Sequence, residues 1–289
     1  MEIGIGLPAT VPGTKGSLVL DWARLADSGP FSSLGIIDRL VYPNYEPLIT
    51  LAAVAGVTSR IRLMSTVVIA PLRGAGVLAK QAASLDALSE GRLSLGLGVG
   101  GREDDFLVAP APFFHDRGRR FEEQLEIMKR VWSGQPLSDE VGPMGPPPAR
   151  PGGPELLIGG YTPAAVRRVG RWGDGYISGG SADPEQTRQL YDIAEESWKE
   201  EGREGRPRFV GGIYYALGPD AADRGADYIR DYYSFFGPAV EEMALAIPST
   251  PEAIEDLIQA FSRIGMDELV WWPTIAELDQ VNRLAEVIS

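Results

Sequence analysis

Glycine-rich turns ahead of a predicted helix are the first feature with a chemical meaning in this sequence of 289 residues. The run Gly159-Gly160-Tyr161-Thr162 follows a short apolar stretch and directly precedes a predicted helix. Backbone N–H groups at a helix N-terminus bind anions, and glycine lets the main chain approach a phosphate closely. A simple strand-to-helix turn is the alternative, but we favour a phosphate site. A second turn, Gly100-Gly101-Arg102, could add a guanidinium that pairs with the same phosphate.

Charged residues at the end of another predicted strand form a second candidate. Asp38 and Arg39 directly follow the apolar stretch 34–37. Ligands bind at the carboxyl ends of strands in parallel α/β folds, so both side chains are candidate catalytic groups. The alternative is that Asp38 caps a loop or pairs with Arg39. His115 is the only histidine, and it fits a loop or a substrate contact better than a metal site; it completes our candidate catalytic set.

Hydrolysis has little support in the sequence. A glycosidase would need a second carboxylate near Asp38, and its candidates are Glu103, Asp104 and Asp105. These three acids lie in a segment without clear periodicity, where solvent exposure and helix capping explain them more simply. No Gly-x-Ser-x-Gly motif is present. The lack of cysteine and the single histidine exclude Cys-based and multi-histidine metal sites, but not carboxylate sites, and we expect no metal. We therefore expect an enzyme whose chemistry comes from an organic cofactor.

The elements that must position these groups are clearest between residues 61 and 102. Residues 63–69 are apolar and almost uncharged, which is typical of a strand buried on both faces of a parallel sheet. An amphipathic helix is predicted next, followed by a second strand with one bulky and one bare side. The bulky side carries Leu93, Leu95, Leu97 and Val99, and the bare side carries Ser94, Gly96, Gly98 and Gly100. We interpret the bare side as room for a ring-shaped cofactor.

The same alternation of strand and helix runs through the chain. About eight predicted strands are separated almost everywhere by helices, which indicates parallel strands with right-handed crossovers. No Gly-x-Gly-x-x-Gly motif follows the first strand, which counts against a dinucleotide-binding fold. We therefore predict an α/β fold, a single (β/α)8 TIM-barrel domain over residues 1–289. It carries a loop insertion at about 133–155 and a helical insertion at about 219–247, whose aromatic run near Tyr232 we interpret as packing between helices or subunits.

Composition limits the partners of this chain. The formal net charge is −13, and no basic cluster of the kind that binds nucleic acid is present. The N-terminal residues have no basic leader with an apolar core, and no apolar run reaches the length of a membrane span. We expect a cytoplasmic protein with no nucleic-acid or membrane partner.

Three segments resemble the luciferase-like monooxygenase superfamily. They are AKQAASLDALSEGRLSLGLGVGG, RGRRFEEQLEIMKRVWSG and LIGGYTPAAVRRVGRWGDGYI, at residues 79–101, 117–134 and 157–177. The resemblance covers nearly the whole chain. It implies a (β/α)8 barrel that uses either flavin mononucleotide (FMN) or the 8-hydroxy-5-deazaflavin coenzyme F-420, often as a homodimer.

The resemblance also implies roles for individual residues. The cofactor phosphate would lie at the loop of Gly159, Gly160 and Tyr161, and a non-proline cis peptide, Thr66-Val67, would lie behind the ring. Further cofactor contacts would come from Gly100, Gly101, Arg102, Ser178 and Gly179. Substrate-side contacts would come from Asp38, Tyr42, His115 and Trp272. On this interpretation Gly160→Asp should abolish cofactor retention and leave the thermal melt unchanged.

One departure from the family pattern affects the expected reaction. Deazaflavin-dependent members commonly have Ser-Asp-His at the end of the second strand, whereas this chain has Ile37-Asp38-Arg39. We therefore expect a monooxygenase that uses reduced FMN and molecular oxygen on a small organic substrate, with a reductase supplying the reduced cofactor. A deazaflavin-dependent hydride-transfer oxidoreductase is the alternative. Two non-enzymatic alternatives are a non-catalytic flavin-binding barrel and a structural barrel that binds a partner protein.

Overall fold

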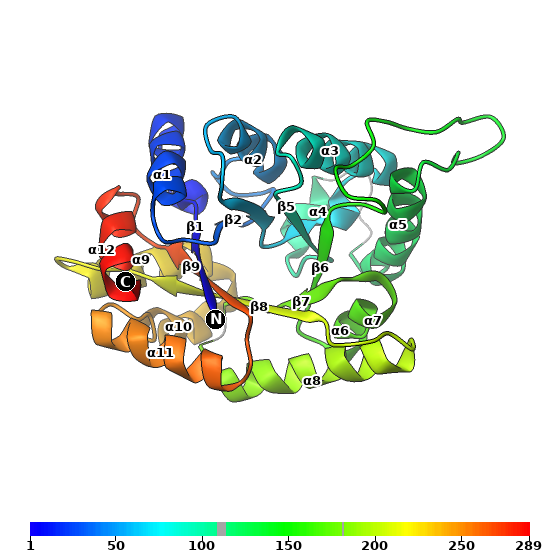
Figure 1. Cartoon of the computed structure of the whole chain (residues 1–289). Helices are drawn as coiled ribbons and strands as arrows, with labels where there is room; N and C mark the ends of the chain where they lie inside the picture. Colours follow the sequence, from blue (N-terminus) through cyan, green and yellow to red (C-terminus); the bar gives the residue numbers. More distant parts are fainter. Residues whose placement is uncertain (109–113, 181) are drawn as a thin grey trace.

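A closed barrel of parallel strands forms the centre of the protein, which confirms the predicted α/β TIM-barrel fold (Figure 1). The computed structural model describes residues 1–108, 114–180 and 182–289. The sheet runs in the order β3-β2-β1-β9-β8-β7-β6-β5-β4, and pairing of β3 with β5 closes it. The strands are β1 (Glu2–Gly6), β2 (Ser33–Ile36), β3 (Arg62–Ser65), β4 (Val68–Ile69), β5 (Leu93–Gly98), β6 (Glu155–Gly159), β7 (Gly175–Ile177), β8 (Arg208–Tyr215) and β9 (Glu268–Pro273).

Helices surround this barrel (Figure 1). The α-helices are α1 (Gly16–Ser28), α2 (Pro47–Ala55), α3 (Ala75–Leu88), α4 (Glu103–Leu107), α5 (Arg117–Trp132), α6 (Pro163–Val166), α7 (Arg168–Trp172), α8 (Pro184–Glu200), α9 (Ala221–Tyr232), α10 (Val240–Leu245), α11 (Pro251–Arg263) and α12 (Asp279–Ile288). The short 3-10 helices are η1 (Pro8–Thr10), η2 (Ala70–Leu72) and η3 (Ser234–Ala239). No helix in the described ranges is both long enough and apolar enough to cross a membrane.

Helix starts follow the local sequence. Thr162 and Thr250 each cap a helix by accepting a hydrogen bond from a backbone N–H three residues later, and a proline follows each of them. Proline is favoured at the first helical position because the N–H that it lacks has no partner there. The predicted helix over 164–172 is in fact two short helices, α6 and α7, and helix α4 was not predicted.

The bulky side of β5 packs against the surrounding helices, as its alternation predicts. Leu93, Leu95 and Leu97 are fully buried in one apolar cluster with side chains of α3 and α5. This cluster follows the outside of the barrel and includes the largest buried side chains of the flanking helices. Burial of this kind contributes about 25 cal/mol per Å² of apolar surface, so this layer stabilises the barrel.

The two segments that we predicted as insertions differ in the structure. Residues 133–154 are irregular, mostly exposed, and extend past α5 at the upper right of Figure 1. The second segment, residues 219–247, contains α9, η3 and α10 and lies between β8 and α11.

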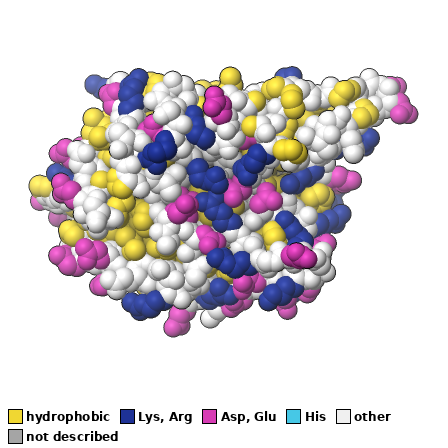
Figure 2. Space-filling view, in the orientation of Figure 1, with side chains coloured by type: hydrophobic (Ala, Val, Ile, Leu, Met, Phe, Trp, Pro, Cys, Tyr) yellow, Lys and Arg dark blue, Asp and Glu magenta, His cyan; other side chains and the backbone are white. Residues whose placement is uncertain are grey.

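The amino end of the barrel is closed by a buried charge network. Glu268 Oε1 accepts hydrogen bonds from Ser32 Oγ and Ser33 Oγ, both at 2.5 Å, and its Oε2 bonds Arg208. Glu155 Oε2 accepts from Ser94 Oγ at 2.5 Å and from Arg208 Nη1 at 2.6 Å. Because the charges of Glu155, Arg208 and Glu268 are paired with one another, we infer that these residues stabilise the fold. On the surface, Figure 2 shows basic and acidic side chains intermixed over the face in view.

Candidate active site

The third barrel strand is interrupted at the carboxyl end of the barrel. A non-proline cis peptide joins Thr66 to Val67, at the position that the family resemblance implies, and it separates β3 from β4. Thr66 donates two hydrogen bonds to Ile36 O, from its backbone N at 2.7 Å and from Oγ1 at 3.0 Å. The interruption is therefore fastened to the end of β2, next to Asp38.

The bare side of β5 has a different use from the one that we expected. A Cβ on Gly96 would lie 2.0 Å from Ser65 O, and a Cβ on Gly98 would lie 2.7 Å from Val67 Cγ2. The room left by the missing side chains is therefore filled by the interrupted third strand and by the Val67 side chain. Our interpretation that this room itself holds a cofactor ring is wrong, because a neighbouring strand occupies it.

Asp38 is held in an ion pair, but its partner is not Arg39. Its Oδ2 lies 2.6 Å from Arg73 Nη1 and accepts a hydrogen bond from Ile69 N at 2.8 Å. Arg73 also bonds Glu46, at 2.9 Å. Burial raises the pKa of the Asp38 carboxyl, and the charge of Arg73 opposes that rise only in part. Asp38 thus joins the loops after β2 and β4, and sequence reasoning did not identify its partner Arg73.

Arg39 lies at the mouth of the barrel against two neighbouring aromatic rings. Its guanidinium carbon is 5.1 Å from the centroid of the Tyr42 ring and 5.2 Å from that of Tyr232. The side chain is 4% exposed, and Nη2 donates a hydrogen bond to Val41 O at 2.8 Å. Within the described ranges, Nε and Nη1 have no hydrogen-bond partner.

Asp105 corrects our interpretation of the acidic run as a solvated loop. It lies on α4 with 1% of its surface exposed. Its Oδ1 accepts hydrogen bonds from Leu40 N at 3.0 Å and Val41 N at 2.7 Å, so it anchors the loop after β2. Its Oδ2 is 3.6 Å from Arg39 Nε. The sequence did not predict that Asp105 is buried, because it stands in an acidic run whose other members are exposed or half-buried.

Helix α9 and η3 cover the mouth of the barrel, and we call these residues, 221–239, the aromatic lid. Tyr232 contacts Tyr42 edge to face at 5.0 Å between ring centroids. Tyr214 of β8 lies 5.1 Å from the ring of Trp272 and 5.9 Å from that of Tyr233. The aromatic run that we interpreted as packing between helices or subunits therefore lies over the strand ends.

Three loops at the strand ends fasten the lid. Tyr228 Oη and Thr10 Oγ1 are 2.7 Å apart, and Tyr42 Oη donates to Asp231 Oδ2 at 2.5 Å. The Arg102 guanidinium lies 4.0 Å from the Phe235 ring centroid, while its Nη2 pairs with Asp104 at 2.7 Å. Burial raises the pKa of Tyr228, so its phenol stays protonated at neutral pH.

Trp272 lies inside the mouth, under the lid. Its indole occupies space that side chains at Gly6, Gly35 and Gly212 would fill. It is 5% exposed, and its Nε1 has no hydrogen-bond partner among the described residues. Arg39, Tyr42 and Trp272, predicted from separate strand ends, are thus brought together through Tyr232 and Tyr214.

The glycine turns differ in how much room they have. A Cβ on Gly101 would meet no atom within 4 Å, whereas a Cβ on Gly160 would lie 2.4 Å from the Cβ of Ala165. Gly160→Asp would therefore disturb packing as well as any phosphate, so our expectation of an unchanged thermal melt is wrong. Tyr161 is 70% exposed and donates to Gly179 O at 2.8 Å.

The remaining predicted cofactor residues lie on neighbouring strand ends. Gly100 adopts a positive φ of 74°, and its carbonyl accepts a hydrogen bond from Arg117 Nε at 3.1 Å. Gly159 ends β6, and Ser178 directly follows β7 and is buried. The turns after β5, β6 and β7 therefore lie side by side at the carboxyl end of the barrel.

His115 lies apart from this group. Its side chain is exposed, and its ring contact is with Phe114 at 5.8 Å between centroids. Nothing in the described contacts joins it to Arg39, Tyr42 or Trp272. Its predicted catalytic role has no geometric support.

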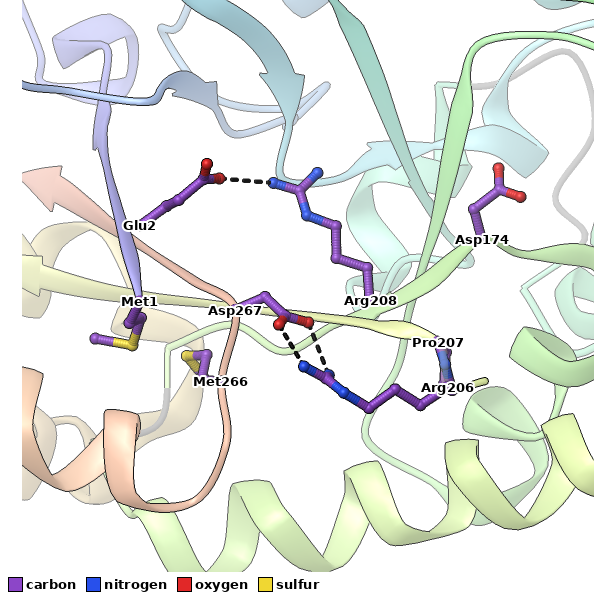
Figure 3. Close-up of a pocket in the computed structure, with 8 residues that line it drawn as sticks. All are labelled: Met1, Glu2, Asp174, Arg206, Pro207, Arg208, Met266 and Asp267. Carbon is purple, nitrogen blue, oxygen red and sulfur yellow. Dashed lines mark hydrogen bonds and ion pairs between the residues drawn. The ribbon is translucent and has the colours of Figure 1, made fainter. Parts of the chain in front are cut away.

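Cavities also open beside the barrel. One of about 760 Å³ opens at the amino end, and Figure 3 shows its Arg206 and Arg208 paired with Asp267 and Glu2. Because these cations are already neutralised, and the strand carboxyl ends are at the other end, we do not assign the active site there. A second cavity of about 460 Å³ lies beside the lid, and Tyr214, Ile229 and Met243 are among its lining residues.

Comparisons with known proteins place this arrangement in a family. A model of the family described as "Luciferase-like monooxygenase" matches residues 1–268. An uncharacterized protein of Mycobacterium tuberculosis is 30% identical over 197 residues, which are 58% of this chain and 67% of the relative.

Three solved structures share the fold. Monooxygenase RslO1 from Streptomyces bottropensis has a TM-score of 0.79 and 21% identity, with 100% of this chain and 97% of that one covered. An F420-dependent secondary alcohol dehydrogenase, solved with an F420–acetone adduct, has a TM-score of 0.77 and 16% identity, with 99% and 97% covered. A type II Baeyer-Villiger monooxygenase of Pseudomonas putida, solved with FMN, has a TM-score of 0.69 and 18% identity, with 94% and 91% covered. The chain is a member of the luciferase-like monooxygenase family.

Proposed function

We propose that this protein is a monooxygenase that binds reduced FMN at the carboxyl end of the barrel and oxygenates a small organic substrate. The family and its solved neighbours support an oxidoreductase, and those neighbours include proteins solved with FMN and with F420. A reductase would supply the reduced cofactor. When bound, the reduced flavin would supply the reaction with molecular oxygen.

The observation that favours FMN over the deazaflavin is the residue after Asp38. A deazaflavin enzyme that exchanges hydride with an alcohol or a ketone must also move a proton, and an imidazole is suited to that step at neutral pH. The arginine in this place has only hydrogen-bond donors and no acceptor for that proton. The only histidine, His115, is exposed and apart from the mouth. An oxygenase places a smaller demand on a protein acid or base.

The residues that would hold the cofactor lie on adjacent strand ends. The Thr66-Val67 interruption would support the ring, and the turns at Gly101 and Gly160 would present backbone N–H groups to the phosphate. Arg102 lies beside the first of these turns. The aromatic lid would exclude water from the reaction, which protects a reactive reduced cofactor.

Parallel fluorescence titrations with FMN and with coenzyme F-420 test the choice of cofactor. We expect FMN to bind at least as tightly as the deazaflavin. Tenfold tighter binding of the deazaflavin, about 1.4 kcal/mol, would overturn the proposal in favour of hydride transfer.

Gly101 offers a site-directed control, because its Cβ position is open. Gly101→Asp should weaken cofactor binding at least tenfold by repelling the phosphate, whereas Gly101→Ala should retain it. Thermal melts of both variants should match the wild type. Equal cofactor affinity in the two variants would place the phosphate elsewhere.

A further inference from the structure

Arg39 carries hydrogen-bonding capacity that the described protein does not use. A guanidinium has five N–H donors, and polar groups that are buried in proteins are nearly always paired. The Arg39 side chain is 4% exposed and also interacts with Tyr232, but neither Nε nor Nη1 meets a hydrogen-bond acceptor in good geometry among the described residues. Asp38, the preceding residue, is different: its carboxylate is bound by Arg73 and Ile69 N. Of these two neighbours, Arg39 is the one left with free donors.

The surroundings of Arg39 limit where a ligand can meet it. The centroids of the Tyr42 and Tyr232 rings lie 5.1 and 5.2 Å from the guanidinium carbon and 5.0 Å from each other, so both rings pack against the same side of the cation. Asp105 Oδ2 lies 3.6 Å from Nε. Of the two nitrogens without a hydrogen-bond partner among the described residues, Nε faces Asp105, which leaves Nη1 for a ligand. An acceptor must approach Nη1 in the plane of the guanidinium, because its N–H bonds lie in that plane.

Charge balance at the mouth favours an uncharged acceptor. Arg39 lies 3.6 Å from Asp105 and 4.0 Å from Asp104, and Arg102 lies 2.7 Å from Asp104. These two cations and two carboxylates offset each other. An anionic ligand would bring an additional, unpaired negative charge into a buried place, which is costly. A carbonyl oxygen accepts hydrogen bonds without adding charge.

We propose that Arg39 is a specificity-determining residue whose Nη1 donates hydrogen bonds to a carbonyl oxygen of an uncharged, ring-containing substrate. The ring would pack among the aromatic side chains of the mouth, including Tyr42, Tyr214 and Tyr232, because offset and edge-to-face contacts stabilise aromatic pairs. This inference rests on the proposed function, since it assigns the substrate of that same site.

Binding of three matched naphthalenes tests the assignment. The probes are 2-acetylnaphthalene, with a neutral carbonyl, 2-naphthoate, with a charge, and 2-ethylnaphthalene, with no acceptor. Dissociation constants are measured by calorimetry on the purified full chain, with and without FMN. We expect the wild type to bind the ketone at least about tenfold more tightly than either other probe.

Arg39→Met removes the donors and should abolish the preference for the ketone over the hydrocarbon. Arg39→Lys keeps the charge beside Asp105 but loses the planar fork, so it should reduce the preference and also provides a folded comparison if the methionine variant is unstable. Arg230→Met is the control, because Arg230 also belongs to the aromatic lid but its guanidinium already binds Glu241 and Asp227. It should keep the preference for the ketone.

If both Arg39 variants keep the preference for the ketone over the hydrocarbon, the proposal is overturned. Arg39 would then serve only to hold the lid in place through its contact with Tyr232. Tighter binding of the naphthoate, or equal binding of ketone and hydrocarbon by the wild type, would also overturn it. FMN affinity, measured on the same samples, tests the proposed function separately. If the wild type does not bind FMN, the flavin site is refuted, whatever the ratio of the dissociation constants of the three probes.

Discussion

The two ends of the barrel both bury charged side chains, but they satisfy them differently. At the amino end, Glu268 accepts hydrogen bonds from two serines and from Arg208. Arg62 also joins this network, with Nη2 3.5 Å from Glu155, and among the described members its Nε is the atom without a hydrogen-bond partner. At the carboxyl end, donors of Arg39 and Trp272 and an oxygen of Asp105 have no hydrogen-bond partner within the described ranges. Fully paired charges stabilise a fold, whereas unpaired buried groups are a cost that a ligand can remove.

The largest expected effect tests the amino end. Glu268→Gln should lower the free energy of unfolding by about 3 kcal/mol, because it removes the charge that Arg208 faces in a fully buried position. Urea denaturation measures the change. The FMN affinity of the folded fraction should stay at the wild-type value. A fall in affinity would contradict the assignment of stability to the amino end and of ligand binding to the carboxyl end.

A smaller loss is expected from a glycine at the carboxyl end. Gly160→Ala should destabilise the protein by about 1–3 kcal/mol, because its Cβ would lie 2.4 Å from that of Ala165. Gly101→Ala is the matched control, since nothing lies within 4 Å of its Cβ position. Equal melting temperatures for the two variants would show that the turn after β6 can accommodate a side chain at position 160 despite the close approach of Ala165.

The pH dependence of stability should differ in sign between the two ends. The folded pKa of Asp38 is raised above its usual 3.8 by burial, so its contribution is fully present below that value and is lost as pH rises through the folded pKa. Burial alone would also raise the pKa of Asp267, but hydrogen bonds from Arg206 and Phe209 N lower it overall. The contribution of Asp267 is therefore present above 3.8 and is lost as pH falls through its folded pKa.

Two asparagine variants separate these contributions. Asp267→Asn should weaken the loss of stability in acid, and Asp38→Asn should weaken the loss of stability as pH rises from 3.8 toward neutrality. Urea melts at a series of pH values measure both. The same slope change in the two variants would contradict the opposite signs.

The smallest effect is expected at His115. His115→Asn should change the free energy of unfolding by less than about 0.5 kcal/mol, since its side chain is exposed. We also expect the pH profile of turnover to keep its shape, because the described ring contact of His115 is with Phe114 and not with the mouth of the barrel. Loss of a step in that profile would return His115 to the active site.

Sequence periodicity predicted the barrel well because each strand has a simple pattern. The alternation of Leu93, Leu95 and Leu97 with Gly96 and Gly98 was enough to assign the two sides of β5. What lies against the bare side could not be read from β5 alone, because it depends on the path of another strand. The Val67 side chain that fills it is 29 residues away from Gly96 in sequence.

The site was predicted less completely for a related reason. Arg39, Tyr42 and Trp272 could be recognised as residues near strand ends, but their common partners come from distant loops. Tyr232 belongs to a helix whose aromatic spacing also fits ordinary packing, and Asp105 lies in an acidic run. Burial of one member of a polar run depends on tertiary contacts, which local sequence does not encode.

The aromatic lid has a consequence for how such proteins diversify. It lies within one uninterrupted segment, residues 219–247, between β8 and α11, while the turns proposed to hold the cofactor come from β5, β6 and β7. Exchange of that one segment could replace the aromatic lid over the substrate and leave those turns intact. A descendant could then inherit its cofactor and acquire a new substrate, so swapping this segment between relatives is a direct route to engineered selectivity.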